Sequence, residues 1–265
     1  MDARAMLLLQ IEWGADEALD PVARDRRRPP DAPPAVPAAP LAAAPMPAPA
    51  VAARVQPVVG RVQPPAAQRA REVAAGAATL AALREALAGF DGCPLAATAT
   101  NLVFADGNPE AGLMFVGEGP GAEEDQLGKP FVGPSGRFLD RMLASIGLDR
   151  TKYVITNLIP WRPPGNRNPT DAEVLTCLPF LLRHIALVQP RHLVLLGALA
   201  ARAVLGGGAG ITRLRGRWHQ ASIPGLEAPV AALPMLHPAY LLRNAGAKRD
   251  AWADLLLLRR TLDGR

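Results

Sequence analysis

The sequence predicts an α/β protein, a three-layer α/β/α sandwich around a central four-stranded parallel sheet. Two observations lead to this fold class. Four short runs are almost entirely apolar, and a helical pattern follows each of them. Such runs are typical of parallel strands, which are buried on both sides because helices cover both faces of the sheet. Polar residues then follow the runs, where ligands bind in sheets of this kind.

The predicted elements alternate in order along the chain. A helix is expected first, over 66–88, where alanine and leucine dominate. The expected strands are 113–117, 153–158, 192–197 and 230–236. The helices that follow them are expected at 135–147, 170–188, 199–205 and 248–262.

Residues 1–66 differ from the rest of the chain. Positions 2–19 have the pattern of a short amphipathic helix, and 12 of the 28 prolines fall between positions 29 and 65. Proline lacks a backbone donor and disrupts helix and sheet interiors, so we expect a disordered Pro/Ala-rich linker after this helix. The predicted division is therefore 1–66 for helix and linker and 67–265 for the folded domain.

The composition narrows the class of protein. An apolar fraction of 49% supports a sizeable core. Two cysteines among 265 residues do not make a disulfide framework, which fits a reducing cytoplasm. Apolar runs are too short for a secretory signal or a membrane span. We expect a soluble cytoplasmic protein.

Side chains with useful chemistry follow the predicted strands. Glu118 follows the first strand, Asn157 lies at the end of the second and His237 follows the fourth. Phe131 stands in a Pro-Phe-Val-Gly loop that favours a presented ring. Since the carboxyl ends of parallel strands meet at one edge, we expect one pocket able to bind a flat heterocycle.

The turn after the first strand reads Gly-Glu-Gly-Pro-Gly-Ala at 117–122. It formally matches the dinucleotide-binding fingerprint, but the acidic residue expected at the end of a second strand is missing. The carboxylates around the turn would also repel a pyrophosphate, and Lys129 is followed by proline rather than by the Ser or Thr of a Walker motif. A purely structural turn is the other alternative.

A basic surface is predicted in the second half of the chain. The rigid loop at 162–169 holds two arginines, and the stretch between Glu173 and Glu227 holds six arginines and no acid. A stretch of this kind suggests a surface that faces phosphates. We expect the two leucines beside an arginine at 241–243 to be exposed in a loop, which fits a wedge into stacked bases.

Together these blocks resemble the uracil-DNA glycosylase superfamily, most closely its family 4 type. That family carries Gly-Glu-Xaa-Pro-Gly with an acidic pair, Pro-Phe-Val-Gly, a strand-end Asn, Arg-Pro-Pro-Xaa-Asn-Arg and His-Pro-Ala-Tyr-Leu-Leu-Arg. All of these motifs stand here in this order, over about residues 87–262. The resemblance implies that 67–265 form a uracil-DNA glycosylase-like catalytic domain.

The resemblance also implies a role for each site residue. Phe131 would stack on a flipped-out uracil, Asn157 would pair with its amide edge, and His237 would stabilise charge growing on O2. Gly119 would also lie at the uracil. The residues implied in DNA binding are Arg162, Asn166, Arg167, Arg215, Leu241, Leu242 and Arg243.

The catalytic residues implied are Glu118, Glu124 and His237. Relatives with the best-defined water activation place an aspartate where this chain has Gly119, which leaves the general base open. Glu118 is the first candidate for this role and Glu124 the second.

Family 4 enzymes usually hold a [4Fe–4S] cluster on four cysteines. Cys93 and Cys177 match two of these ligand positions, but Phe90 and Trp161 occupy the other two. Two thiolates do not make a four-ligand site, so we expect no cluster, no other metal and no organic cofactor.

The sequence thus predicts a monofunctional uracil-DNA glycosylase, a hydrolase of base excision repair that leaves an abasic site. Its expected partner is uracil-containing DNA, with no membrane. We expect a monomer whose N-terminal tail contacts a repair or replication protein. Two alternatives stay open. One is a catalytically inactive nucleic-acid-binding module, against which Asn157 and His237 argue. The other is a nucleotide-binding enzyme, against which Glu118 argues.

Overall fold

A computed structural model describes residues 65–264, so the predicted N-terminal helix and almost all of the predicted linker lie outside the described residues. The centre of the described part is a six-stranded sheet in the order β1-β3-β2-β4-β6-β5. The strands are β1 Ala105–Gly107, β2 Leu113–Gly117, β3 Val154–Asn157, β4 His192–Leu196, β5 His219–Ala221 and β6 Val230–Met235.

The four central strands are parallel, as predicted, but the predicted strand number is wrong. β2 pairs in parallel with β3 and β4, and β4 pairs in parallel with β6. The additional strands β1 and β5 are antiparallel to β3 and β6 and form the two edges of the sheet. Each has only three residues, and neither is an apolar run.

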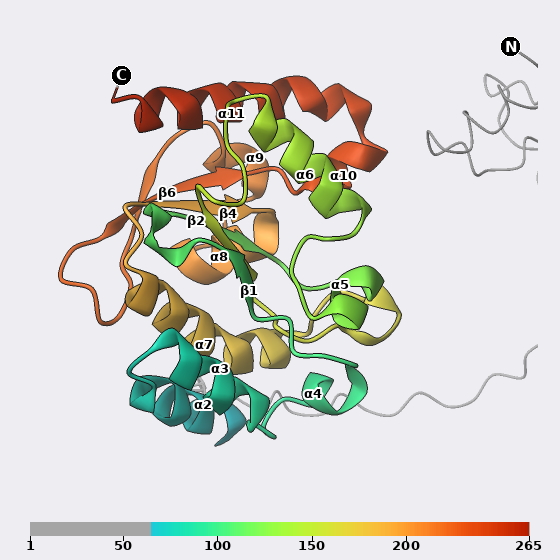
Figure 1. Cartoon of the computed structure of the whole chain (residues 1–265), viewed down its shortest axis with the longest axis vertical. Coiled ribbons are helices and arrows are strands. Elements are labelled where there is room, and N and C mark those ends of the chain that lie inside the picture. The colour runs from blue at the N-terminus through green and yellow to red at the C-terminus, as the bar shows by residue number, and fades with distance from the viewer. Residues whose placement is uncertain (1–64, 265) are drawn as a thin grey trace, which may run out of the picture. The chain divides into compact units, whose positions relative to one another are not determined.

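Helices cover both faces of this sheet (Figure 1), which confirms the predicted three layers. The helices are α2 Pro65–Gly76, α3 Leu80–Ala88, α4 Leu95–Thr98, α5 Ala122–Leu127, α6 Pro134–Ala144, α7 Asp171–Val188, α8 Ala198–Leu205, α9 Ile211–Leu214, α10 Pro238–Arg243 and α11 Lys248–Leu262. None of these helices, all within 65–264, is long and apolar enough to cross a lipid bilayer.

Alternate side chains of each central strand enter different cores. In β2, Met114 and Val116 pack with α2, α3, α7 and α8, whereas Leu113 and Phe115 pack with α6 and α11. All five residues of β2 are buried. The apolar run is therefore explained by burial on both faces of the sheet.

The helix predicted over 66–88 is two helices, because Thr79 caps the start of α3 with its side chain and ends the continuity. The short helices α4, α5, α9 and α10 were not predicted. Two of them, α5 and α10, follow β2 and β6 directly, and both contribute to the pocket at the carboxyl ends of the strands.

Candidate active site

A pocket of about 600 Å³ lies at the carboxyl ends of the parallel strands. Its walls bring together four side chains that the sequence analysis selected, from four different segments. Glu118 comes from the turn after β2, Phe131 from the loop before α6, Asn157 from the end of β3 and His237 from the start of α10. The predicted residues Gly119, Glu124, Asn166, Arg167 and Arg243 also line the pocket.

Asn157 offers an unsatisfied hydrogen-bonding group. The residue is 5% exposed, and its Oδ1 has no hydrogen-bond partner within the described residues. A Cβ atom at Gly117 would lie 2.5 Å from this oxygen and equally close to the Phe131 ring. Glycine in the neighbouring strand therefore makes room for both side chains. Buried polar atoms are rarely left unpaired, so the free oxygen is suited to a donor on a ligand.

His237 is neutral and its tautomer is defined. Its Nδ1 accepts a hydrogen bond from the Ala239 N–H at 3.2 Å, at the start of α10. Burial, with a smaller contribution from the charge of Arg243, lowers the pKa of His237 to about 4. A neutral imidazole whose Nδ1 accepts carries its proton on Nε2. The ring therefore has an N–H donor for a group bound in the pocket.

Glu118 is a carboxylate withdrawn from water. Burial raises its pKa above the ordinary value of 4.5, and the nearby charge of Arg202 offsets only part of this effect. Within residues 65–264, its carboxylate receives no hydrogen bond from another side chain. A carboxylate with a raised pKa in a cleft is a candidate general base.

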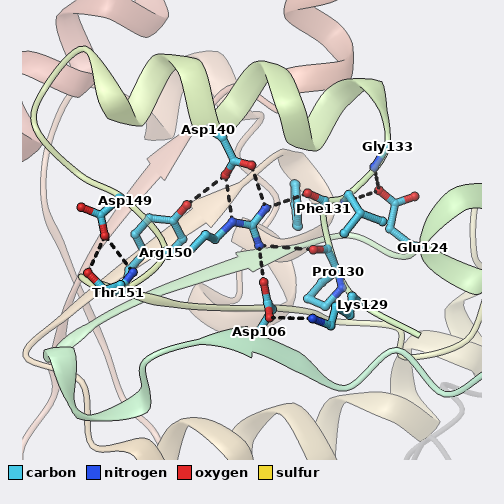
Figure 2. Close-up of polar contacts among 12 residues, drawn as sticks. Asp106, Glu124, Lys129, Pro130, Phe131, Gly133, Asp140, Asp149, Arg150 and Thr151 are labelled. Atoms are coloured by element: carbon cyan, nitrogen blue, oxygen red, sulfur yellow. Dashed lines mark hydrogen bonds and ion pairs between the residues drawn. The ribbon is translucent and has the colours of Figure 1, made fainter. Parts of the chain in front are cut away.

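The Glu124 carboxylate is held by three backbone N–H groups. Its Oε1 accepts hydrogen bonds from the Val132 N–H at 3.0 Å and the Gly133 N–H at 2.7 Å, and its Oε2 accepts one from the Gly121 N–H at 3.1 Å. The carboxylate therefore joins the turn after β2 to the loop before α6. Figure 2 shows the bond to Gly133. This geometry favours Glu118 over Glu124 as the base.

Phe131 lies beside His237 in the pocket. The two ring centroids are 5.9 Å apart, and the planes are tilted by 35°. The Phe131 side chain is almost fully buried, although the residue lies in a loop. The loop thus presents the ring as a wall of the pocket.

The loop at 162–169 forms a basic rim. Arg167 lines the pocket and pairs with the buried Glu173 at 2.6 Å, and Arg162 donates to the Asn166 side chain at 2.7 Å. The hydrogen bond from Arg167 holds the pKa of Glu173 at about 2. Glu173 also closes a capping box with Thr170, which starts α7. The loop is therefore anchored to a helix.

Two residues predicted to contact DNA are placed elsewhere. Leu241 is fully buried between α6 and α11 and cannot act as a wedge, whereas Tyr240 and Leu242 are each 43% exposed. Arg215 is mostly buried and makes two hydrogen bonds of 2.9 Å to Asp254. These bonds tie Arg215 to α11. Leu241 is not free because it lies on the buried side of α10. Arg215 is not free because it is paired with Asp254, which is distant in the sequence.

Sequence reasoning also missed Tyr240 and Arg150. Tyr240 lies at the pocket rim beside Arg243, and the spacing of buried Pro238 and Leu241 on α10 would have placed it on the outer side. Arg150 lies behind the Phe131 loop, and no sequence pattern marks it.

The residues at the cluster position do not fit a [4Fe–4S] group. Cys93 Sγ and Cys177 Sγ lie 3.9 Å apart, and both thiols are buried. Phe90 and Trp161 are buried in the same core, and Phe90 packs edge-on against Phe180 at 5.0 Å. Two sulfur ligands and two aromatic rings cannot supply four thiolates. No group of three or more His, Cys, Asp or Glu residues suited to a metal is found in the described part of the chain.

Fold and pocket together define an α/β protein that can hold a planar, hydrogen-bonding ring next to a basic surface. Residues 104–256 match the sequence model of the family described as the uracil DNA glycosylase superfamily. The chain therefore belongs to the uracil-DNA glycosylase superfamily, and its relatives place it with the family 4 type.

Several relatives carry the name type-4 uracil-DNA glycosylase. The protein from Pyrobaculum aerophilum is 36% identical over 66% of this chain and 90% of its own length. The protein from Thermotoga maritima is 42% identical over 57% of this chain and 77% of its own length. The protein from Archaeoglobus fulgidus is 41% identical over 61% of this chain and 82% of its own length.

Proposed function

We propose that this protein is a monofunctional uracil-DNA glycosylase that hydrolyses the N-glycosidic bond of deoxyuridine in DNA and leaves an abasic site. The observation that carries the proposal is the convergence of Asn157, Phe131 and His237 on one pocket. The names of the relatives support the same activity.

The hydrogen-bonding groups of the pocket suit uracil better than cytosine. The free Oδ1 of Asn157 can accept from the N3–H of uracil, and its amide N–H can donate to O4. Cytosine has no N3–H and has an amine in place of O4, so both contacts would be lost with the amide in this orientation. The Phe131 ring supplies a stacking surface for either base.

The leaving base is stabilised by a neutral donor. As the bond between C1′ and N1 breaks, its electron pair moves onto the base and negative charge builds on O2. The Nε2–H of His237 can donate to this oxygen as the charge grows. The oxygen of a water molecule bonds to C1′, Glu118 accepts its proton, and the uracil anion takes up a proton after release.

The target nucleotide has to leave the base stack, at a cost of a few kcal/mol. Arg162, Arg167 and Arg243 are proposed to bind phosphates around the pocket. With Leu241 buried, the exposed Tyr240 and Leu242 are the side chains available to fill the vacated space.

The enzyme is proposed to work without an iron–sulfur cluster, since Phe90 and Trp161 fill the space that two ligands would need. We also propose that residues 67–265 form the whole catalytic domain, acting as a monomer in the cytoplasm. Residues 1–66 would then bind a repair or replication protein and would not take part in the excision reaction.

The test is an excision assay. The full chain and a protein of residues 65–265 are each incubated with a duplex that contains one uracil, and alkali then cleaves any abasic site. Both proteins are expected to cut the uracil duplex at similar rates and to leave matched duplexes with cytosine or thymine intact. Binding without cleavage would instead support the inactive nucleic-acid-binding module.

A further inference from the structure

We infer that Arg150 is a positioning residue for excision, which fixes the Phe131 ring against the uracil by holding the Phe131 backbone from behind. The inference rests on the proposed function and extends it to a residue outside the pocket. Arg150 lies in the turn between α6 and β3 and does not line the pocket.

The backbone of Phe131 needs such support. Its φ of +56° lies in the left-handed region, which is uncommon for a residue with a Cβ atom and unusual for a bulky one. Conformations of this kind persist where the surroundings hold them, and they gather at functional sites. The side chain proposed to stack on the uracil is thus attached to a residue with an uncommon backbone conformation.

The guanidinium of Arg150 supplies the support. Its Nη2 donates to the Phe131 carbonyl at 2.6 Å, and its Nη1 donates to the Pro130 carbonyl at 3.3 Å. Figure 2 shows the guanidinium at the centre of a network that ends on these two carbonyls. Arg150 therefore holds two successive peptide groups of the loop.

The guanidinium is itself held by carboxylates. Asp140 of α6 accepts from Nε at 2.8 Å and from Nη2 at 3.2 Å, and Asp106 of β1 accepts from Nη1 at 3.2 Å. The Tyr153 hydroxyl donates to Asp140 at 3.0 Å. A planar fork fixed by two carboxylates loses little further freedom when it binds the carbonyls. The network thus ties the loop to a helix and to the edge of the sheet.

The loop is clamped from its other end and from one side. Glu124 accepts the N–H groups of Val132 and Gly133, the two residues after Phe131. A Cβ atom at Gly136 would lie 2.0 Å from the Phe131 carbonyl oxygen, so glycine there lets this carbonyl lie against α6. The position of the carbonyl that Arg150 binds is therefore fixed both by these hydrogen bonds and by the close contact with Gly136.

Positioning matters because misplacement of a reacting partner by about 1 Å can cost on the order of 100-fold in rate. Loss of Arg150 should let the loop relax to an ordinary backbone conformation and swing the ring away from the uracil. Loss of Arg150 should therefore weaken uracil binding and slow the excision step. DNA binding should be unchanged, because Arg150 lies behind the loop.

The experiment compares Arg150→Met and Arg150→Lys with the control Arg259→Met. Arg259 makes the same kinds of bond, to Asp263 and to the Ile146 carbonyl at 3.2 Å, but neither partner belongs to the loop that holds Phe131. We expect Arg150→Met to lower the single-turnover excision rate by on the order of 10–100-fold and to weaken inhibition by free uracil, with duplex binding unchanged. Arg150→Lys should recover part of the loss, and Arg259→Met should behave as wild type.

A double-mutant cycle with Phe131→Ala separates positioning from general destabilisation. If Arg150 acts through the ring, Arg150→Met should cost nothing further in a protein that already lacks the ring. Losses that multiply would overturn the inference, as would a wild-type rate for Arg150→Met.

Gly136→Ala provides a second variant if Arg150→Met does not fold, because the added methyl would displace the same carbonyl. It should slow excision and weaken uracil inhibition in the same way, and an unaffected Gly136→Ala would count against the inference. A wild-type protein that leaves uracil in place would defeat the proposed function, whereas an active wild type with equally active variants would defeat only the role of Arg150.

Discussion

The carboxylate of Glu118 and the imidazole of His237 face the same pocket, and burial shifts both toward their neutral forms. Burial raises the pKa of Glu118 and lowers the pKa of His237 to about 4. The consequences differ, because the proposed base has to be charged to accept a proton and the proposed donor works as a neutral ring. Glu118 should therefore set the acid limit of activity.

Single-turnover excision should fall as the pH drops through the pKa of Glu118, above the ordinary value of 4.5. His237 should add no step near its ordinary value of 6.5, because its pKa is about 4. Glu118→Gln should be slow, and its rate should lack this acid limb. A Glu118→Gln protein with the wild-type rate and profile, measured from about pH 4.5 to 8, would remove Glu118 from the mechanism.

The sequence allowed Asn157, His237 and Phe131 to be selected because each stands in a motif or at a predicted strand end. It could not show that Leu241 faces inward or that Arg215 is paired with Asp254, which lies 39 positions later. Arg150 was missed for the same reason, since its partners lie on β1, α6 and the Phe131 loop. Contacts of this range depend on the assembled fold.

At the scale of the elements, the central strands were predictable because burial on both faces requires a continuous apolar run. The edge strands β1 and β5 have exposed positions and only three residues each, so they leave no such signal. The short helices α5 and α10 have only six residues each, and their sequences resemble those of loops. These two helices carry part of the pocket wall.

The packing of α7 against the segment before α4 leads to a prediction about iron. The Sγ atoms of Cys177 on α7 and Cys93 lie 3.9 Å apart, in the core that also holds Phe90 and Trp161. We expect purified protein to lack iron and the visible absorbance of a cluster. Joint Phe90→Cys and Trp161→Cys substitution should allow reconstitution with about four irons per chain. Stoichiometric iron in the wild-type protein would contradict this account of the site.

At the scale of the whole molecule, the parallel sheet gathers the ends of distant segments and the basic loops surround them. Affinity for an undamaged duplex should fall steeply with salt as counterions are released from the DNA. Arg243→Ala should reduce the slope of log affinity against log salt by about one. Arg84→Ala, on the exposed side of α3, should leave the slope unchanged. Equal slopes for wild type and both variants would show that Arg243 does not bind phosphate.

The central claim is that Asn157 and His237 form one uracil-excising site. Its most direct test is the single-turnover rate of uracil excision by wild type, His237→Ala and Asn157→Asp, with duplex binding measured alongside. His237→Ala should lose on the order of 100–1,000-fold in rate with little change in binding, because its donor acts on charge that grows in the transition state. Asn157→Asp should also be slow on uracil, since a carboxylate faces O4 without a donor, and its discrimination against cytosine should weaken. Near-wild-type rates for both variants would contradict the claim.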